Sequence, residues 1–184
     1  MKTKTGKIRT AEMAYIALFA VLIAVCSWIS IPAAVPFTMQ TFAVFAAVGL
    51  LGGRRGSIAV AVYLLLGAVG LPVFAGFKGG FGVLLGSTGG YIAGFLLSAL
   101  AMWLMEKLFG KSTPVLALSM FVGLIICYAF GTAWFMQVYA KTSGEIGVLT
   151  ALGFCVFPYI IPDTLKILLA LFLTKKLGPH IRLD

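Results

Sequence analysis

Two charged residues of opposite sign stand three positions apart in an otherwise apolar stretch. They are Asp163 and Lys166, within the segment YIIPDTLKILL. On a helix this spacing places both side chains on one face, close enough to pair. A carboxylate beside an ammonium group offers strong hydrogen-bond acceptors and donors together, which suits a small ligand with N–H and C=O groups or a carboxylate. An internal salt bridge that only fixes helix packing is the alternative interpretation.

Long apolar runs make up most of the chain around this pair. Of the 184 residues, 61% are hydrophobic and 10% are charged, more apolar surface than a soluble domain of this size can bury. Uncharged runs cover residues 13–35, 56–77 and 112–140, and each exceeds the roughly 20 residues that a spanning helix needs. We therefore predict an all-α integral membrane protein that forms one unit over residues 1–184. Because charge inside a span is costly, Asp163 and Lys166 are expected to face the bundle interior.

Six transmembrane helices are predicted from the apolar runs and the breaks between them. Their expected ranges are Glu12–Ile31, Pro36–Leu51, Ser57–Leu71, Gly89–Lys107, Thr113–Gln137 and Gly147–Lys176. The last helix is interrupted by Pro158 and Pro162. Since proline is favoured in the first turn of a helix, Pro162 predicts that the helix restarts just before Asp163.

Basic residues predict the orientation of these helices. Eleven of the fourteen lysines and arginines precede the first expected helix, lie at or beyond the end of the last, or lie at the connections between helices two and three and between four and five, with the helix ends included. Only Lys78 and Lys141 fall on the opposite side. The positive-inside rule therefore predicts that both termini are cytoplasmic. The net charge of +9 is explained by topology, and no nucleic-acid partner is expected.

A long glycine-rich connection lies on the predicted extracellular side, between helices three and four. It covers Pro72–Thr88, PVFAGFKGGFGVLLGST. Apolar loops of this length are usually lids or binding loops, and packing over the helix ends is the alternative. Its GVLLGST stretch lacks the lysine that a phosphate-binding loop carries after its last glycine, so no nucleotide site is predicted. With a single histidine and no paired cysteines, no metal site is expected either.

Other polar residues are predicted at the same depth as the charged pair. Gln40, in VPFTMQTF, and Tyr91, after GSTGG, fall at the outer ends of their helices and would line the same pocket, although each also suits a structural role. In the first helix, Ala17, Ala20 and Ala24 recur at spacings of three and four. Small residues at such spacing allow another helix to approach closely, either within the bundle or in a partner.

Three segments of the chain resemble the BioY family, the biotin-specific membrane subunits (S components) of energy-coupling factor transporters. They are VPFTMQTFAVFAAVGLLGGRRG, YLLLGAVGLPVFAGFKGGFGVLLGSTGGYIAGF and IPDTLKILLA. The resemblance implies a subunit of the bacterial cell membrane that captures substrate and works with a membrane coupling subunit and two cytoplasmic ATPases. It implies Asp163 and Lys166 as ligand contacts, with Gln40 and Tyr91 beside them. It also implies that the first helix meets the coupling subunit through Ala20 and Ala24.

Biotin suits the predicted pocket, because it has apolar rings, a ureido group with two N–H donors and a carbonyl, and a carboxylate tail. Asp163 would accept a ureido N–H, and Lys166 would donate to the ureido oxygen or to the carboxylate. Lys78 is a second candidate for the carboxylate. Alternatives are an S component for another small vitamin, a self-contained secondary transporter and an intramembrane enzyme. The only histidine is His180, near the end of the sequence, and there is no metal cluster or nucleophile motif to complete an enzyme site, so we expect no catalysis and no cofactor.

Overall fold

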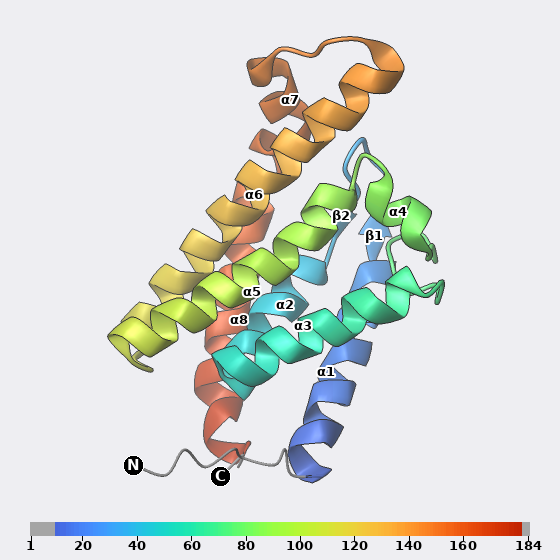
Figure 1. The fold of residues 1–184 in the computed structure, drawn as a ribbon. Helices are drawn as coiled ribbons and strands as arrows, with labels where there is room; N and C mark the ends of the chain where they lie inside the picture. Colours follow the sequence, from blue (N-terminus) through green and yellow to red (C-terminus); the bar gives the residue numbers. More distant parts are fainter. Residues whose placement is uncertain (1–9, 182–184) are drawn as a thin grey trace, which may run out of the picture.

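The structure is a computed structural model that describes residues 10–181, and helices make up most of it (Figure 1). The elements in chain order are α1 (Thr10–Trp28), β1 (Ser30–Ile31), β2 (Phe37–Thr38), α2 (Gln40–Leu51), α3 (Gly53–Ala68), α4 (Phe81–Leu85), α5 (Gly89–Phe109), α6 (Thr113–Ser143), α7 (Val148–Cys155) and α8 (Ile160–Leu177). Short 3-10 turns lie at Phe157–Tyr159 and Gly178–His180.

Four helical segments among the described residues are long and apolar enough to cross a membrane. They are Thr10–Trp28, Gly89–Phe109, Thr113–Ser143 and Val148–His180. Helices α2 and α3 have 12 and 16 residues. At 1.5 Å per residue they rise about 18 and 24 Å, less than the roughly 30 Å of a bilayer core. The chain is thus a helical multi-pass protein in which four of the six expected spans have spanning length.

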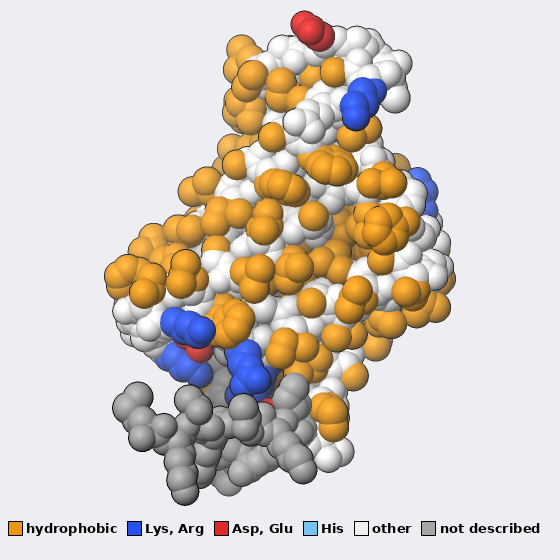
Figure 2. All heavy atoms as spheres, in the orientation of Figure 1, with side chains coloured by type: hydrophobic (Ala, Val, Ile, Leu, Met, Phe, Trp, Pro, Cys, Tyr) orange, Lys and Arg blue, Asp and Glu red, His pale blue; other side chains and the backbone are white. Residues whose placement is uncertain are grey.

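Exposed hydrophobic side chains cover the sides of the molecule, as expected for contact with lipid (Figure 2). In this view most Lys and Arg side chains gather at one end. Arg55 pairs with Glu12 at 2.5 Å and Lys111 pairs with Glu106 at 3.2 Å, and these four residues line one surface pocket. Arg55 was expected in a connecting loop. It lies instead in the first turn of α3, because only Gly52 separates this helix from α2.

The first two expected helices are shorter than predicted, because a pair of strands replaces their facing ends. Ser30–Ile31 pairs antiparallel with Phe37–Thr38, so α1 ends at Trp28 and α2 begins at Gln40. The strands are only two residues long. They nevertheless fix the backbone of Phe37 and Thr38 at the entrance of α2.

The last expected helix is broken near its prolines, as predicted. The chain turns at Phe157–Tyr159 and resumes as α8 at Ile160, two residues before the predicted restart at Pro162. Pro162 is tolerated there because the first-turn N–H groups of a helix have no partner within the helix. Asp163 falls in the first turn of α8, where the positive end of the helix dipole stabilises a carboxylate.

The glycine-rich connection is not a plain loop, because it contains α4 and a tight turn. The indole N–H of Trp28 donates to the carbonyl of Pro72 at 2.9 Å, and that of Trp134 donates to the carbonyl of Gly86 at 2.9 Å. Between them the ring of Phe74, 1% exposed, packs edge-on against Tyr63 with ring centroids 5.6 Å apart. The connection is therefore anchored to the bundle at both ends and in between.

Candidate functional site

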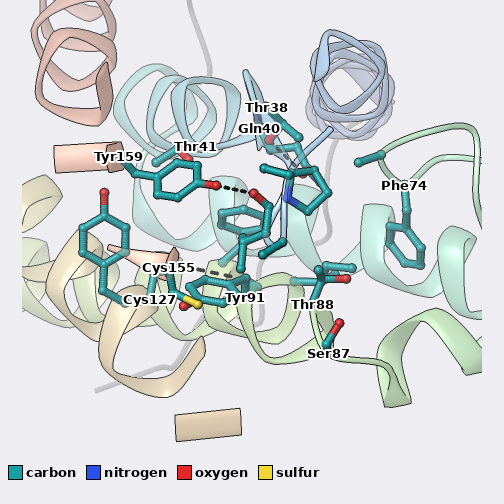
Figure 3. A pocket seen from close by; sticks show the side chains of 18 of the residues that line it. Thr38, Gln40, Thr41, Phe74, Ser87, Thr88, Tyr91, Cys127, Cys155 and Tyr159 are labelled. Atoms are coloured by element: carbon teal, nitrogen blue, oxygen red, sulfur yellow. Dashed lines mark hydrogen bonds between the residues drawn. The ribbon is translucent and has the colours of Figure 1, made fainter. Parts of the chain in front are cut away.

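A cavity of about 450 Å³ lies between the strand pair, the glycine-rich connection and helices α2, α5, α6 and α8 (Figure 3). This volume falls within the usual range of small-molecule sites. All five residues that the sequence predicted for a ligand line it: Asp163, Lys166, Gln40, Tyr91 and Lys78. They come from four separate parts of the chain, and the fold brings them together.

Asp163 and Lys166 form the ion pair predicted from their spacing. The distance from Lys166 Nζ to Asp163 Oδ1 is 2.7 Å, and the two residues are 4% and 5% exposed. Both point into the bundle and line the cavity. The cost of placing each charge in an apolar environment is offset by the partner charge and by further hydrogen bonds.

Each member of the pair has additional partners from other elements. Lys166 Nζ donates to the backbone carbonyl of Thr38 at 2.6 Å and lies 4.0 Å from the ring centroid of Phe37. Tyr128 donates its hydroxyl to Asp163 Oδ2 at 2.6 Å. The pair therefore also fixes α8 against β2 and α6, so the packing role that the sequence left open is part of its function in the fold.

The pair retains hydrogen-bonding capacity toward the cavity. An ionised carboxylate has about four acceptor positions, and an ammonium group has three donors. Within the described residues Asp163 accepts two hydrogen bonds and Lys166 donates two. The site can thus accept N–H groups from a ligand at Asp163 and donate one hydrogen bond to it from Lys166.

Gln40 and Tyr91 line the cavity, but their polar atoms are bonded within the protein. The Gln40 amide donates to the hydroxyl of Tyr63 at 2.5 Å, and its oxygen accepts from the hydroxyl of Thr38 at 3.0 Å. The hydroxyl of Tyr91 shares a hydrogen bond of 2.8 Å with Thr132. Both residues shape the wall, and the structural role considered for them accounts for their hydrogen bonds.

The profile of the BioY family matches residues 1–182. The chain belongs to the BioY family. The biotin transporter BioY of Thermotoga maritima is 42% identical over 161 residues, which cover 87% of this chain and 91% of the relative. The probable biotin transporter BioY of Pyrococcus horikoshii is 34% identical over 92% of this chain and 98% of its own length. The family expected from the sequence is thereby confirmed.

A solved structure shares the fold. The crystal structure at 2.1 Å of the S-component for biotin from an ECF-type ABC transporter superposes with a TM-score of 0.82 at 26% identity. The match covers 97% of this chain and 95% of the solved one. The chain therefore shares the fold of this S-component for biotin along nearly its whole length.

Several tyrosines of this BioY family member were missed by reasoning from sequence. Tyr128 bonds Asp163 directly, Tyr63 bonds Gln40, and Tyr159 donates to the carbonyl of Val35 (Figure 3). A tyrosine within an apolar helix is itself a signal, because its buried hydroxyl requires a partner. The sequence does not indicate which partner, since the bonded residues are far apart along the chain.

The alanines of α1 do not share one exposed face. Ala20 and Ala24 are 1% and 5% exposed and belong to the core of this BioY fold, whereas Ala17 is exposed. The first two therefore match the alternative of packing within the bundle, since as placed they present no surface to a partner. Of the three residues expected to meet a coupling subunit, Ala17 alone is accessible.

Proposed function

We propose that this chain is the biotin-binding membrane subunit of an energy-coupling factor transporter. The observation that carries the proposal is the buried Asp163–Lys166 pair, which lines a ligand-sized cavity in a fold shared with a biotin S component. The relatives named as biotin transporters support the same substrate. Their names also argue against the intramembrane enzyme considered from the sequence.

The bonding capacity of the pair matches the ureido group of biotin. Asp163 accepts a hydrogen bond from a ureido N–H. The carboxylate thereby takes the place of the water molecule to which this N–H donates in solution. The one remaining N–H of Lys166 donates to an oxygen of the ligand. Hydrogen bonds that involve an ionised group are stronger than neutral ones, and more so where water is excluded. The apolar rings and chain of biotin lie against the rest of the wall, which includes Ile92, Phe95 and Leu124.

The proposed topology has six spans and two cytoplasmic ends. Helices α2 and α3 are the two remaining spans beside the four longer ones. Their short length is accommodated by packing inside the bundle, where α2 is buried along most of its length. The basic end of the molecule carries Arg54, Arg55, Lys107 and Lys111, which supports its assignment to the cytoplasm. The cavity and the glycine-rich connection then face the outside of the cell.

Transport in this proposal requires partners, namely a membrane coupling subunit and two cytoplasmic ATPases. The solved relative is described as a component of an ECF-type ABC transporter, which supports such an assembly. The exposed face of α1 that includes Ala17 is the proposed contact with the coupling subunit. The bound subunit delivers biotin inward after ATP hydrolysis by its partners.

Mass spectrometry of the ligand that co-purifies with the protein tests the substrate. Cells are grown with biotin and a mixture of other small vitamins, and the purified protein is denatured to release its ligand. Recovery of biotin near one molecule per chain supports the proposal. Recovery of a different vitamin would contradict it and favour an S component of other specificity. Ion-driven uptake by the lone protein in liposomes would instead support the secondary transporter.

A further inference from the structure

A second lysine, Lys78, lines the cavity and differs from Lys166 in its electrostatic surroundings. Lys166 has a carboxylate 2.7 Å away, so the net charge near it is close to zero. Lys78 is exposed, and within residues 10–181 it takes part in no ion pair. An anionic group is therefore attracted to Lys78, whereas at Lys166 the attraction is opposed by Asp163.

The backbone of Lys78 is held in place by a tight turn. The N–H of Phe74 donates to the carbonyl of Lys78 at 2.9 Å, and the reverse bond measures 3.3 Å. Phe77 has φ of +57°, a left-handed conformation that is unfavourable for a residue with a side chain. Its ring stacks on Trp28 with centroids 5.0 Å apart, and such conformations persist only where the surroundings hold them. The turn thus presents Lys78 at a fixed position.

The turn that carries Lys78 and the buried ion pair line the same cavity from separate parts of the chain. Figure 3 shows Phe74 across the cavity from Cys127 and Tyr159. The latter two flank the segments that carry Tyr128 and Asp163, whose side chains bond each other. Because Lys78 and the ion pair line one cavity, a ligand with one polar group at each end and an apolar middle can contact both.

We propose that Lys78 binds the carboxylate of the ligand's tail while the ureido group occupies the Asp163–Lys166 side. This inference rests on the proposed function, and it assigns the remaining donor of Lys166 to the ureido oxygen. The neutral ureido group then binds at the Asp163–Lys166 pair, whose charges cancel. The anionic carboxylate binds at Lys78, whose charge is not cancelled by a carboxylate of the described residues. The exposed position of Lys78 keeps the charged tail near solvent, which avoids the cost of burying it fully.

Isothermal titration of the purified full-length protein with biotin and with biotin methyl ester tests the assignment. We expect Lys78→Gln to weaken biotin binding about tenfold and to leave ester binding within twofold of wild type. Lys78→Arg, which keeps the charge, should recover most of the biotin affinity. The matched control is Lys141→Gln, an exposed lysine on α6 that does not line the cavity, and it should change neither ligand.

Two results would overturn the role of Lys78. One is an unchanged biotin affinity in Lys78→Gln, and the other is an equal loss for biotin and its ester. A wild-type protein that binds neither ligand would contradict the proposed function itself, so the two failures are distinguishable. Thermal unfolding of each variant in detergent establishes that it is folded, as expected for a substitution at an exposed position.

Discussion

Replacement of Asp163 by asparagine preserves the shape of the side chain and removes its charge. Asp163 is 4% exposed and bonds both Lys166 and Tyr128, so the substitution changes a buried network. An amide still has one acceptor oxygen, but its NH2 group is a donor. It would face the donor groups of Lys166 and Tyr128, with which it cannot form a hydrogen bond. We therefore expect biotin to lose a charge-assisted hydrogen bond and the network to lose its only carboxylate.

The expected loss of affinity follows from the strength of such bonds. A hydrogen bond to a charged group contributes about 1.5–3 kcal/mol, and each 1.4 kcal/mol corresponds to a factor of ten. Biotin affinity should therefore fall roughly 10- to 150-fold. Removing one member of a buried ion pair also destabilises a protein by about 3–5 kcal/mol. The lower end applies here, because Lys166 keeps its bond to Thr38 and its contact with Phe37.

The assay is isothermal titration with biotin, paired with thermal unfolding in detergent. The double variant Asp163→Asn/Lys166→Met removes both charges, so we expect it to regain stability relative to the single variant while binding stays weak. That pattern separates loss of a ligand contact from loss of the fold. Biotin affinity of Asp163→Asn within twofold of wild type would refute the reasoning, because a carboxylate that accepts a ligand N–H cannot be replaced without loss.

Three further perturbations separate positioning, stability and coupling. Tyr128→Phe removes the hydroxyl that holds Asp163, and titration should show biotin affinity reduced roughly two- to tenfold, about 0.5–1.5 kcal/mol; unchanged affinity would argue against a positioning role. Glu106→Ala leaves the N–H of Gly53, now bonded at 2.5 Å, without its partner, and denaturation should show a loss of about 1–3 kcal/mol with biotin affinity intact. Ala17→Trp should spare biotin binding and abolish ATP-driven uptake by the reconstituted complex, and normal uptake would place the coupling contact elsewhere.

The ion pair could be predicted from sequence because its information is local. Asp163 and Lys166 are three residues apart on one helix, and both are charged where charge is costly, so pairing and inward orientation followed directly. The partners of the pair depend instead on tertiary packing. Tyr128 lies 35 residues away on α6, and the carbonyl of Thr38 lies 128 residues away. No pattern within a single helix specifies such contacts.

The alanines of α1 illustrate a second limit. A spacing of small residues indicates that something approaches closely, but the same pattern describes a neighbouring helix and a separate partner. Burial of Ala20 and Ala24 could only be decided once the other helices were placed. Likewise, the strand pair and α4 are too short to leave a periodic signal, so the ends of the first two expected helices and the interior of the glycine-rich connection were missed.

The placement of the tryptophans gives the protein an intrinsic optical reporter. The chain has three, and Trp28 and Trp134 each hydrogen-bond one end of the glycine-rich connection. The third, Trp103, lies near the last turn of α5, with Lys107 4.4 Å above its ring. In a Trp103→Phe variant all indole emission would come from the two residues that brace this connection. A shift of the emission spectrum during a titration with ligand would then report a rearrangement of the glycine-rich connection without any attached dye.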